Sequence, residues 1–216
     1  MTKIIDKESW YNKARRRWQH TEASNAGVLG GFDVNEVDIA KSRQLLDYLI
    51  IKGKINTNSV IDCAAGIGRI SKNLLTKYFN NVDILEQDEK FVNHCHKEFA
   101  RNPIVRNIYH DSLQKFIFKH SYDVIWIQWC LEDLEDDGLF HFLQNCKKAL
   151  NANGVVIIKD NIVDDEMGFW EKDFAKIRSD KVYKEIFAQC GFQVSLHYHQ
   201  PNWPKELMKI SIYVLN

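Results

Sequence analysis

The chain has 216 residues, 45% of them hydrophobic, so it is long enough for one well-buried domain and too short for two comfortable ones. Its 29 basic residues balance its 29 acidic residues, so the chain has no overall field that would attract nucleic acid or an anionic membrane. We therefore expect a single domain, 1–216, acting as a monomer whose partners are selected by local charge, with no nucleic-acid or membrane partner.

The cysteines and the first residues indicate the compartment. The cysteines form an odd set without a C-x-x-C pair, namely Cys63, Cys95, Cys130, Cys146 and Cys190. This arrangement argues against a disulfide framework and a structural zinc site, and it favours a reducing compartment. The first ten residues carry charges where a secretory signal has its apolar core, and no apolar run approaches the roughly 18 residues that span a membrane. We expect a cytoplasmic or nuclear protein.

The first predicted element is an amphipathic helix over residues 36–51, which ends before Gly53. From there, short apolar runs alternate with helical patterns along the chain. Strands are expected at 59–63, 82–86, 104–109, 122–128 and 154–159, and helices at 69–79, 88–99, 136–150 and 179–190. This alternation is typical of an α/β fold with a doubly wound, mainly parallel sheet.

The two final apolar runs, 192–199 and 206–215, are expected to pair as an antiparallel hairpin at one edge of the sheet. About 55 residues precede the first strand, and a second insertion occupies about 161–178. Both segments are long enough to be lids over a site. The domain should thus consist of an N-terminal helical extension, 1–57, and a Rossmann-like core, 58–216.

The turn after the first predicted strand is the most informative segment. It reads Asp62-Cys-Ala-Ala-Gly-Ile-Gly-Arg69, and its small residues keep side chains out of the space above the strand end, where open α/β sheets bind nucleoside cofactors. Glu86 ends the next strand, where a carboxylate can accept hydrogen bonds from ribose hydroxyls. The turn therefore predicts a nucleoside cofactor at this strand end.

Two cofactors compete for such a turn. A nicotinamide dinucleotide needs a third small residue and a helix N-terminus free to receive pyrophosphate. Here Ala64 replaces the first glycine, and the bulky Ile70 stands where the pyrophosphate helix would pack. The sequence favours S-adenosylmethionine, which carries a ribose but no phosphate, while a plain glycine turn is the structural alternative.

Acidic residues gather after two strand ends that should face the ligand. One group occupies 132–137 and the other begins at Asp160 and includes Asp173. An acidic rim of this kind suggests a cationic substrate. Residues 135–137 are better explained as the start of the next helix, where negative charge favours the helix dipole. Asp133 and Asp173 are the stronger functional candidates.

Aromatic and basic residues give further candidates. Trp126 is assigned to the core, whereas Trp129, beyond its strand end, and Trp18 could wall a pocket and stabilise a methylammonium group by cation–π contact worth about 0.5–2 kcal/mol. The run 15–17, three arginines, is interpreted as a solvated helix face.

Two histidines, His197 and His199, share one face of a strand, because they are two residues apart. They could ligate a metal if a third ligand came from elsewhere. No further ligand cluster is visible in the sequence, so we expect no metal site.

With these residues assembled, the chain resembles the protein α-N-terminal methyltransferases over nearly its whole length. This family methylates the free amine of proteins that begin Xaa-Pro-Lys or Xaa-Pro-Arg. The resemblance is carried by residues 10–18, 29–32, 62–69, 123–129 and 154–161, together with Asp173 and Arg178. Its most specific parts are Ile-Trp-Ile-Gln-Trp, ending at Trp129, and Ile-Lys-Asp-Asn, ending at Asn161. It implies a class I fold that uses S-adenosylmethionine.

The resemblance also implies roles for individual residues. The cofactor would be bound by Ala64, Gly66, Gly68, Arg69, Glu86, Gln87, Leu113, Gln114 and Gln128, with Arg69 reaching its carboxylate. The N-terminal peptide of the substrate protein would insert between Trp18, Leu29, Gly30, Trp129, Asn161 and Asp173. Asn161 would hydrogen-bond the peptide backbone, and Trp129 would pack on the proline.

The chain departs from the family pattern at three positions. The usual Gly-His is here Glu132-Asp133, so a proposed general-base histidine becomes a carboxylate. A family tyrosine falls on Met208, and a family serine falls on Ala175. These changes bear on the rate and the peptide preference more than on the type of reaction.

The expected chemistry needs a neutral amine about 3–3.5 Å from the methyl carbon. An α-amine titrates at about 7.7–8.0, far below lysine, so a nearby carboxylate can take the departing proton at physiological pH. Asp173 is the first choice for this catalytic role and Asp133 the second. Two alternatives stay open: a class I methyltransferase for a small cationic or amine substrate, and a non-catalytic S-adenosylmethionine-binding module. An oxidoreductase is a more distant possibility.

Overall fold

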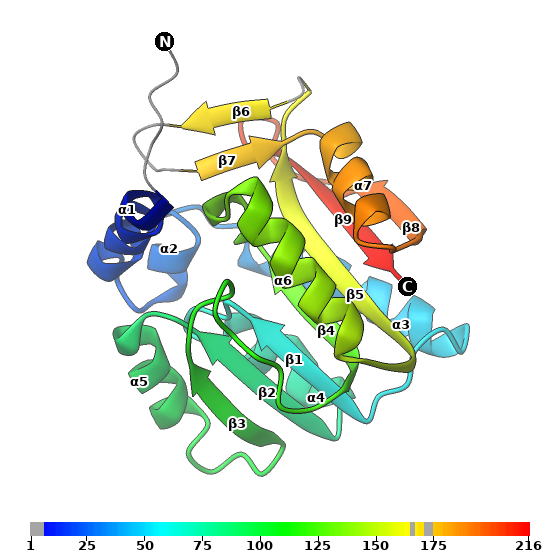
Figure 1. Ribbon diagram of the computed structural model, residues 1–216. Coiled ribbons are helices and arrows are strands. Elements are labelled where there is room, and N and C mark those ends of the chain that lie inside the picture. The colour runs from blue at the N-terminus through cyan, green and yellow to red at the C-terminus, as the bar shows by residue number, and fades with distance from the viewer. Residues whose placement is uncertain (1–6, 165–166, 171–174) are drawn as a thin grey trace.

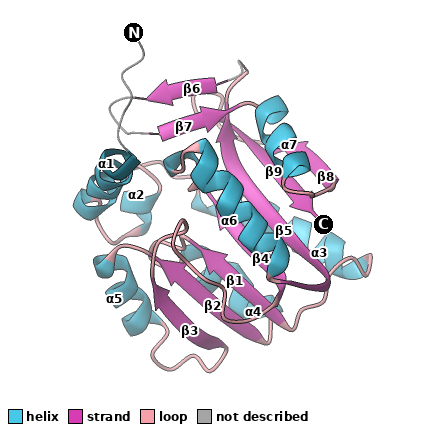
Figure 2. Cartoon of the chain, viewed as in Figure 1, coloured by secondary structure: helices cyan, strands magenta, loops and turns pink. Residues whose placement is uncertain are grey.

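The computed structural model describes residues 7–164, 167–170 and 175–216. A mixed, mainly parallel sheet forms the middle layer, with helices on both of its faces (Figures 1 and 2). Its strands are β1 (Ser59–Cys63), β2 (Asn81–Glu86), β3 (Val105–His110), β4 (Tyr122–Gln128), β5 (Leu150–Ile162), β6 (Met167–Trp170), β7 (Ala175–Arg178), β8 (Val194–His199) and β9 (Lys209–Leu215). The helices are α1 (Lys7–His20), α2 (Asn25–Val28), α3 (Asn35–Ile51), α4 (Thr76–Tyr78), α5 (Glu89–Glu98), α6 (Asp136–Lys148) and α7 (Asp180–Gln189), with a π-helical turn η1 (Ser71–Leu75) and a 3₁₀ turn η2 (Leu131–Asp133).

The strand order confirms the predicted doubly wound topology. Strands β3, β2, β1, β4 and β5 lie side by side and run parallel, with β1 at the point where the order reverses. Strand β9 then pairs antiparallel with β5, and β8 pairs antiparallel with β9 at the edge, as the predicted C-terminal hairpin requires. In such a sheet a ligand binds beyond the carboxyl ends of the strands at the reversal point, here between β1 and β4.

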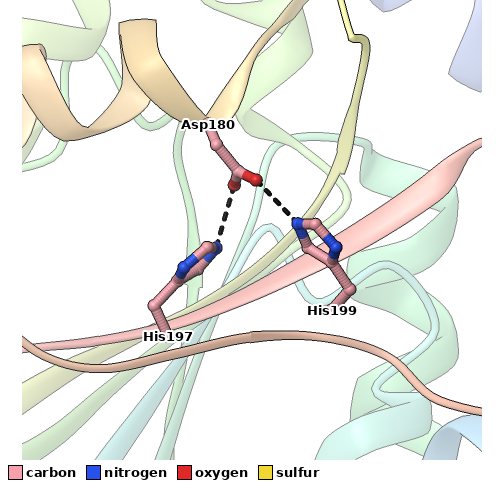
Figure 3. Close-up of side chains that lie close together, drawn as sticks. All are labelled: Asp180, His197 and His199. Atoms are coloured by element: carbon pink, nitrogen blue, oxygen red, sulfur yellow. Dashed lines mark hydrogen bonds and ion pairs between the residues drawn. The ribbon is translucent and has the colours of Figure 1, made fainter.

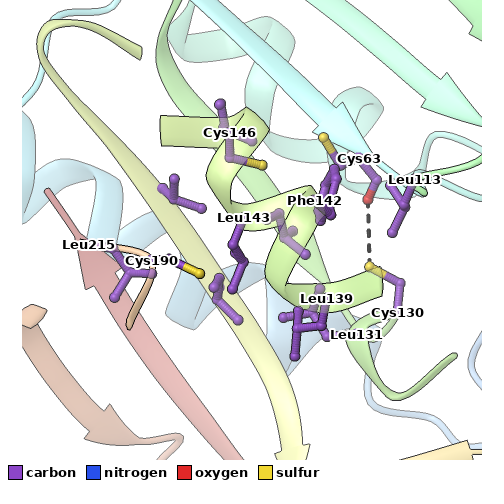
Figure 4. Packing of buried hydrophobic residues seen from close by; sticks show 14 of the residues in the cluster. Cys63, Leu113, Cys130, Leu131, Leu139, Phe142, Leu143, Cys146, Cys190 and Leu215 are labelled. Atoms are coloured by element: carbon purple, nitrogen blue, oxygen red, sulfur yellow. Dashed lines mark hydrogen bonds between the residues drawn. The ribbon is translucent and has the colours of Figure 1, made fainter. Parts of the chain in front are cut away.

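The parallel strands are buried on both faces, so each strand contributes alternate side chains to two cores. One core joins the sheet to α6 and α7, and the other joins it to α3, η1 and α5. Figure 4 shows the first core, in which Phe142 of α6 lies beside Cys63 of β1, and Leu139 and Leu143 of the same helix belong to the same cluster. All five cysteines are free and buried, and burial raises the pKa of each thiol whose shift is resolved, including Cys63 and Cys146. They serve as small apolar fillers.

The predicted helix 69–79 is only partly right. The chain there forms the π-helical turn η1 followed by the short α4, because the Thr76 N–H donates to the Ser71 carbonyl five residues before it. The Thr76 hydroxyl donates to the same carbonyl at 3.0 Å, and the Ser71 N–H and hydroxyl are both bound by the Asp62 carboxylate. These bonds hold the wider turn against the end of β1. Turns of this kind are frequent at functional sites.

The insertion at 161–178 differs from its sequence pattern, in which no strand is predicted. Strand β5 continues to Ile162, and the short strands β6 and β7 form an antiparallel hairpin that joins β5 at its end, where Ile162 pairs with Arg178. Strands of four residues give almost no period-two signal, so only the pairing partner reveals them. None of the described helices combines the length and the apolar character needed to cross a bilayer.

The N-terminal segment lies over two parts of the core. Helix α3 covers the sheet face that also holds η1 and α5, through Ile39, Leu45, Leu46 and Leu49. Helices α1 and α2 lie beside the arrowheads of β1 and β2 in Figure 1. The extension therefore stands where a ligand at the carboxyl ends of the strands would be covered.

Candidate active site

A cavity of about 980 Å³, measured with its open mouth, lies at the carboxyl ends of β1, β2 and β4. Its floor is the turn after β1, and α1 contributes Tyr11, Ala14 and Trp18 from above. The sequence-predicted residues that line it are Trp18, Ala64, Gly66, Arg69, Glu86, Gln87, Leu113, Gln114, Gln128, Trp129 and Asp133. Most of the predicted cofactor site is thus brought together at one place.

The turn after β1 brings main-chain atoms to the cavity. Ala64 and Gly66 both have positive φ angles, 55° and 58°, which alanine adopts only at a cost in strain. The Ala65 N–H donates to the Leu85 carbonyl at 3.1 Å, which ties the turn to β2. Asp62, beneath the turn, is fully buried. Burial raises its pKa to about 6, although the two hydrogen bonds from Ser71 act to lower it. Strain at this position is typical of a ligand-binding turn.

Glu86 is held in place by three backbone N–H groups. Its Oε1 accepts from Gln87 and Asp88 at 2.7 and 2.8 Å, and its Oε2 accepts from Gly66 at 2.7 Å. Burial raises the pKa of Glu86 although these donors oppose the shift. Since each carboxylate oxygen has two lone pairs, Oε2 keeps one acceptor site toward the cavity. A ribose hydroxyl is a suitable donor to that site, and the ribose role of Glu86 stays a prediction.

Arg69 and Gln128 belong to a buried network that the sequence reading missed. Asp38 of α3 lies 2.5 Å from Lys159 of β5 and 2.8 Å from Arg69, and the Gln128 amide donates to both of its oxygens. Burial lowers the pKa of Lys159, although the negative charge of Asp38 acts to raise it. Burial opposes ionisation of Asp38 too, yet Lys159 and Arg69 hold its pKa below the usual range. The network fixes the two cavity residues and joins α3 to the sheet.

A signal for this network was present in the sequence. Lys159 follows four apolar residues in a strand that is buried on both faces, and a buried ammonium needs a counter-ion. The partner, Asp38, is 121 residues away along the chain, so only the fold identifies it.

Trp129 stands at the end of β4 with a φ angle of 53°, a strained conformation for a bulky residue. Its N–H donates to the Lys159 carbonyl at 2.9 Å, and the Arg69 guanidinium lies 5.2 Å from its ring centroid. Its indole Nε1 is buried without a hydrogen-bond partner among the described residues. An unpartnered donor in a cavity wall is a place where a ligand acceptor fits.

Asp133, also in the cavity wall, is hydrogen-bonded to α1. We call α1 the lid helix, because its side chains line the cavity from above. The Asp133 carboxylate accepts from Arg17 at 2.7 Å and from the Trp18 indole at 2.8 Å, and the Asp133 carbonyl accepts from the Trp10 indole at 2.8 Å. Burial raises the pKa of Asp133 against the nearby guanidinium. The interpretation of residues 15–17 as a solvated face is therefore wrong for Arg17. Its partner lies 116 residues away, beyond the reach of helical periodicity.

Part of the acidic rim is structural. Asp160 is fully buried and accepts from the Leu131 and Asn161 N–H groups, while burial and the Glu132 charge raise its pKa. Arg178, also fully buried, donates to the carbonyls of Leu131 and Leu134 and to the Asp136 carboxylate. These contacts shape the segment that carries Asp133.

Four predicted site residues do not line the cavity. Gly68 lies against α5, where a Cβ atom would come within 2.6 Å of the Phe99 ring, so its small size is needed for packing. Leu29 is buried at the end of α2, and Gly30 follows it with a φ angle of 64°. Asn161 donates to Glu132 at 3.1 Å. Asp173 lies outside the described residues, so its role stays a prediction.

Several cavity residues were not assigned to the site from the sequence, although two of them, Asp62 and Ala65, belong to the predicted cofactor turn. They are Tyr11, Ala14, Val28, Asp62, Ala65, Ile70, Leu85, Phe91, Asp111, Cys130 and Leu134. Most are apolar residues whose spacing indicates only core, so no sequence signal separates them from packing residues. Phe91 and Trp18 meet edge to face, with ring centroids 6.5 Å apart, and together join α5 to the lid helix.

The fold, the strained turn and the carboxylate at the end of β2 define a nucleoside-dependent enzyme of the class I methyltransferase type. The family model described as AdoMet dependent proline di-methyltransferase matches residues 6–216, and the chain belongs to this family. S-adenosylmethionine is accordingly its cofactor.

Curated proteins and solved structures agree with this assignment. The chain is 37% identical to Alpha N-terminal protein methyltransferase 1 of Oryza sativa subsp. indica, covering 97% of this chain and 72% of that protein. It is 34% identical to N-terminal Xaa-Pro-Lys N-methyltransferase 1 of Homo sapiens, covering 98% and 97%. A SAM-dependent methyltransferase structure from Leishmania major superposes with a TM-score of 0.91 at 36% identity, covering 98% of this chain and 85% of that one. The resemblance drawn from the sequence is therefore confirmed.

Proposed function

We propose that this protein transfers a methyl group from S-adenosylmethionine to the free α-amino group of proteins that begin Xaa-Pro-Lys or Xaa-Pro-Arg. The observation that carries the proposal is the cavity itself: a cofactor-binding turn and an aromatic wall, Trp18 and Trp129, meet in one space under a lid helix. Relatives named N-terminal Xaa-Pro-Lys N-methyltransferase, similar over nearly the full chain, support the choice of substrate.

The residues present fit S-adenosylmethionine. Glu86 Oε2 has a free acceptor site for the ribose, and Gly66, with a φ angle of 58°, places no side chain above the strand end. Arg69 and Gln128 both line the cavity, where Arg69 would reach the carboxylate of the methionine part and Gln128 would lie beside that part. Leu113 and Gln114 line the cavity where adenine would lie. When bound, the cofactor supplies an electrophilic methyl group on a sulfonium centre.

The protein's own residues have three tasks in the reaction. Trp18 and Trp129 exclude water and present aromatic faces, which stabilise the cationic product nitrogen. The α3 network keeps Arg69 and Gln128 in position. A carboxylate takes the proton that the substrate ammonium loses before it can attack.

We assign this carboxylate to Asp173 first and to Asp133 second. Asp133 lies in the cavity wall, but Arg17 and Trp18 each donate to one of its oxygens, and the positive charge of Arg17 opposes protonation of this carboxylate. In this proposal Asp133 holds the lid closed and Asp173 acts on the amine. The acidic rim predicted from the sequence would receive the third-position Lys or Arg of the substrate.

A methylation assay tests the proposal. Peptides that start Ser-Pro-Lys and Ala-Pro-Lys are incubated with the cofactor, and mass spectrometry detects added methyl groups. N-acetylated copies are the matched control, because acetylation removes the nucleophilic lone pair and leaves the rest of the peptide unchanged. Methylation of the free peptides alone supports the proposal, and methylation of acetylated peptides at lysine contradicts it.

The same experiment separates the alternatives. The fold is shared with a phosphoethanolamine N-methyltransferase from Haemonchus contortus, at a TM-score of 0.79 and 16% identity, so a small amine is a suitable comparison substrate. Transfer to phosphoethanolamine but to no peptide would indicate a small-molecule enzyme. Calorimetric binding of the cofactor without transfer to any acceptor would indicate a non-catalytic module. We further propose action in the cytoplasm or the nucleus, where the five free cysteines would stay reduced.

A further inference from the structure

A cluster of two histidines and one aspartate lies away from the cofactor cavity, between α7 and β8. His197 and His199 point from β8 toward Asp180, the first residue of α7 (Figure 3). The Nε2 atoms of the two imidazoles lie 3.0 and 2.7 Å from the two oxygens of this carboxylate. None of the three residues lines the cavity, so the methyl-transfer chemistry does not use them.

The three side chains have the spacing of ligands around one ion. Their donor atoms all lie within 4.8 Å of one another. Two ligands bound at about 2.0–2.2 Å to one ion are themselves roughly 3 Å apart, close to the two nitrogen–oxygen distances seen here. Two of the residues come from strand β8 and one from the start of helix α7, so the ligands are supplied by two packed elements.

Neighbouring residues fix the ligands as an outer shell does. The Ser211 hydroxyl donates to Asp180 Oδ1 at 2.5 Å, and the Tyr213 hydroxyl donates to the same oxygen. The His197 ring stacks on Tyr213 with centroids 4.8 Å apart and an interplanar angle of 11°. The Ser211 hydroxyl also lies 3.2 Å from His197 Nε2. The two hydroxyls engage Oδ1 and leave Oδ2, which faces His199, as the ligand atom of the carboxylate. Outer-shell bonds of this kind orient metal ligands.

The electrostatics and the accessibility of the cluster suit a cation. Burial opposes ionisation of Asp180, but the hydroxyls and histidines around it hold its pKa well below the usual range. Lys184 is a nearby positive charge that opposes a cation near His197. The His199 side chain is 52% exposed, against 22% for His197, so an ion has a path from solvent on the His199 side.

We propose that Asp180, His197 and His199 bind a divalent transition-metal ion of the Zn²⁺ class. The ligands are Nε2 of each histidine and Oδ2 of Asp180, and water completes the coordination. In each imidazole the Nε2 proton moves to Nδ1, so the ring stays neutral and its Nε2 lone pair faces the metal. Mg²⁺ and Ca²⁺ prefer oxygen ligands and are excluded by the two nitrogens. The bound ion joins the start of α7 to β8.

Titration of the full chain, prepared without a histidine tag, tests the site. Calorimetry with ZnCl₂ should give saturable one-to-one binding, and Co²⁺ should give visible absorption bands of a low-symmetry nitrogen and oxygen site. We expect His199→Gln and His197→Gln each to weaken Zn²⁺ binding by about tenfold or more. His141→Gln, at an exposed histidine on α6, is the matched control and should bind like the unchanged chain.

A melting curve of each variant accompanies the titration. Zn²⁺ should raise the melting temperature of the unchanged chain and of His141→Gln, but not of His199→Gln, whose position is too exposed for the substitution to disturb folding. Absence of saturable Zn²⁺ binding would overturn the proposal. Binding that stays unchanged in both His197→Gln and His199→Gln would also overturn it, because the ion would then sit elsewhere. No readout here depends on methyl transfer, so this test and that of the proposed function fail independently.

Discussion

Replacing Asp38 tests how the buried network holds the candidate site together. Asp38 and Lys159 are both fully buried, and Asp38 also neutralises Arg69 at 2.8 Å. Asp38→Asn keeps the size of the side chain and removes its charge. Two buried cations then lose their counter-ion, while the Ser42 hydroxyl, 2.8 Å from the Lys159 ammonium, remains.

The expected loss of stability is large. Removing one partner of a buried ion pair costs about 3–5 kcal/mol, because the other charge stays buried and unpaired. For Lys159 this cost is limited to about 5 kcal/mol, since an amine of ordinary pKa near 10.4 can be held neutral at pH 7 for 1.36 kcal/mol per pH unit. For a chain of this size, 3–5 kcal/mol lowers the melting temperature by roughly 6–20 °C.

Urea unfolding at pH 7 measures this change, with Lys159→Met as the second arm of a double-mutant cycle. In the Lys159→Met background the cost of Asp38→Asn should fall by about 1–3 kcal/mol, because one of the two cations is gone. The stability of Asp38→Asn should also rise with pH, since the unfolded chain then binds more protons at Lys159 than the folded chain. A cost below about 1 kcal/mol, or the same cost in both backgrounds, would refute the assigned pairing.

Three further predictions concern the candidate site. Glu86→Ala should weaken S-adenosylmethionine binding by roughly 10–150-fold in calorimetry, the worth of a hydrogen bond to a charged group, and unchanged affinity would contradict the ribose role. Asp173→Asn should remove most turnover in the peptide assay while leaving cofactor affinity nearly intact, and full activity would exclude it as the base. Asp62→Asn keeps an acceptor for both Ser71 donors and removes a carboxyl whose pKa is raised to about 6. Because the pKa of Asp62 is raised in the folded state, its protonated carboxyl contributes stability below about pH 3.9, and this stability is lost as the pH rises through about 6. At pH 7 Asp62→Asn should therefore be more stable than the unchanged chain by up to about 3 kcal/mol. Unfolding curves at pH 4 and pH 7 that show equal differences between the two chains would count against this assignment.

Much of the fold follows from local sequence patterns. The apolar runs around Val60, Val82 and Val124 predict parallel strands because both faces of the sheet are buried, and the alternation with helical patterns gives the doubly wound order. The turn from Asp62 to Arg69 and the carboxylate of Glu86 identify the cofactor site, because a ligand that approaches the main chain needs small residues at a strand end. These properties depend on neighbours in the chain, so the sequence alone determines them.

Only the tertiary structure shows which residues pair across the chain in the buried network, at the lid helix and in the histidine cluster. The counter-ion of Lys159 is Asp38, the partner of Arg17 is Asp133, and the carboxylate that meets His197 and His199 is Asp180. In each case a charged or polar side chain is satisfied by a residue from another element, and a single sequence does not identify which residue that is. Periodicity places Arg17 on a helix face and His199 on a strand face, but only the packing of those elements shows what each face meets.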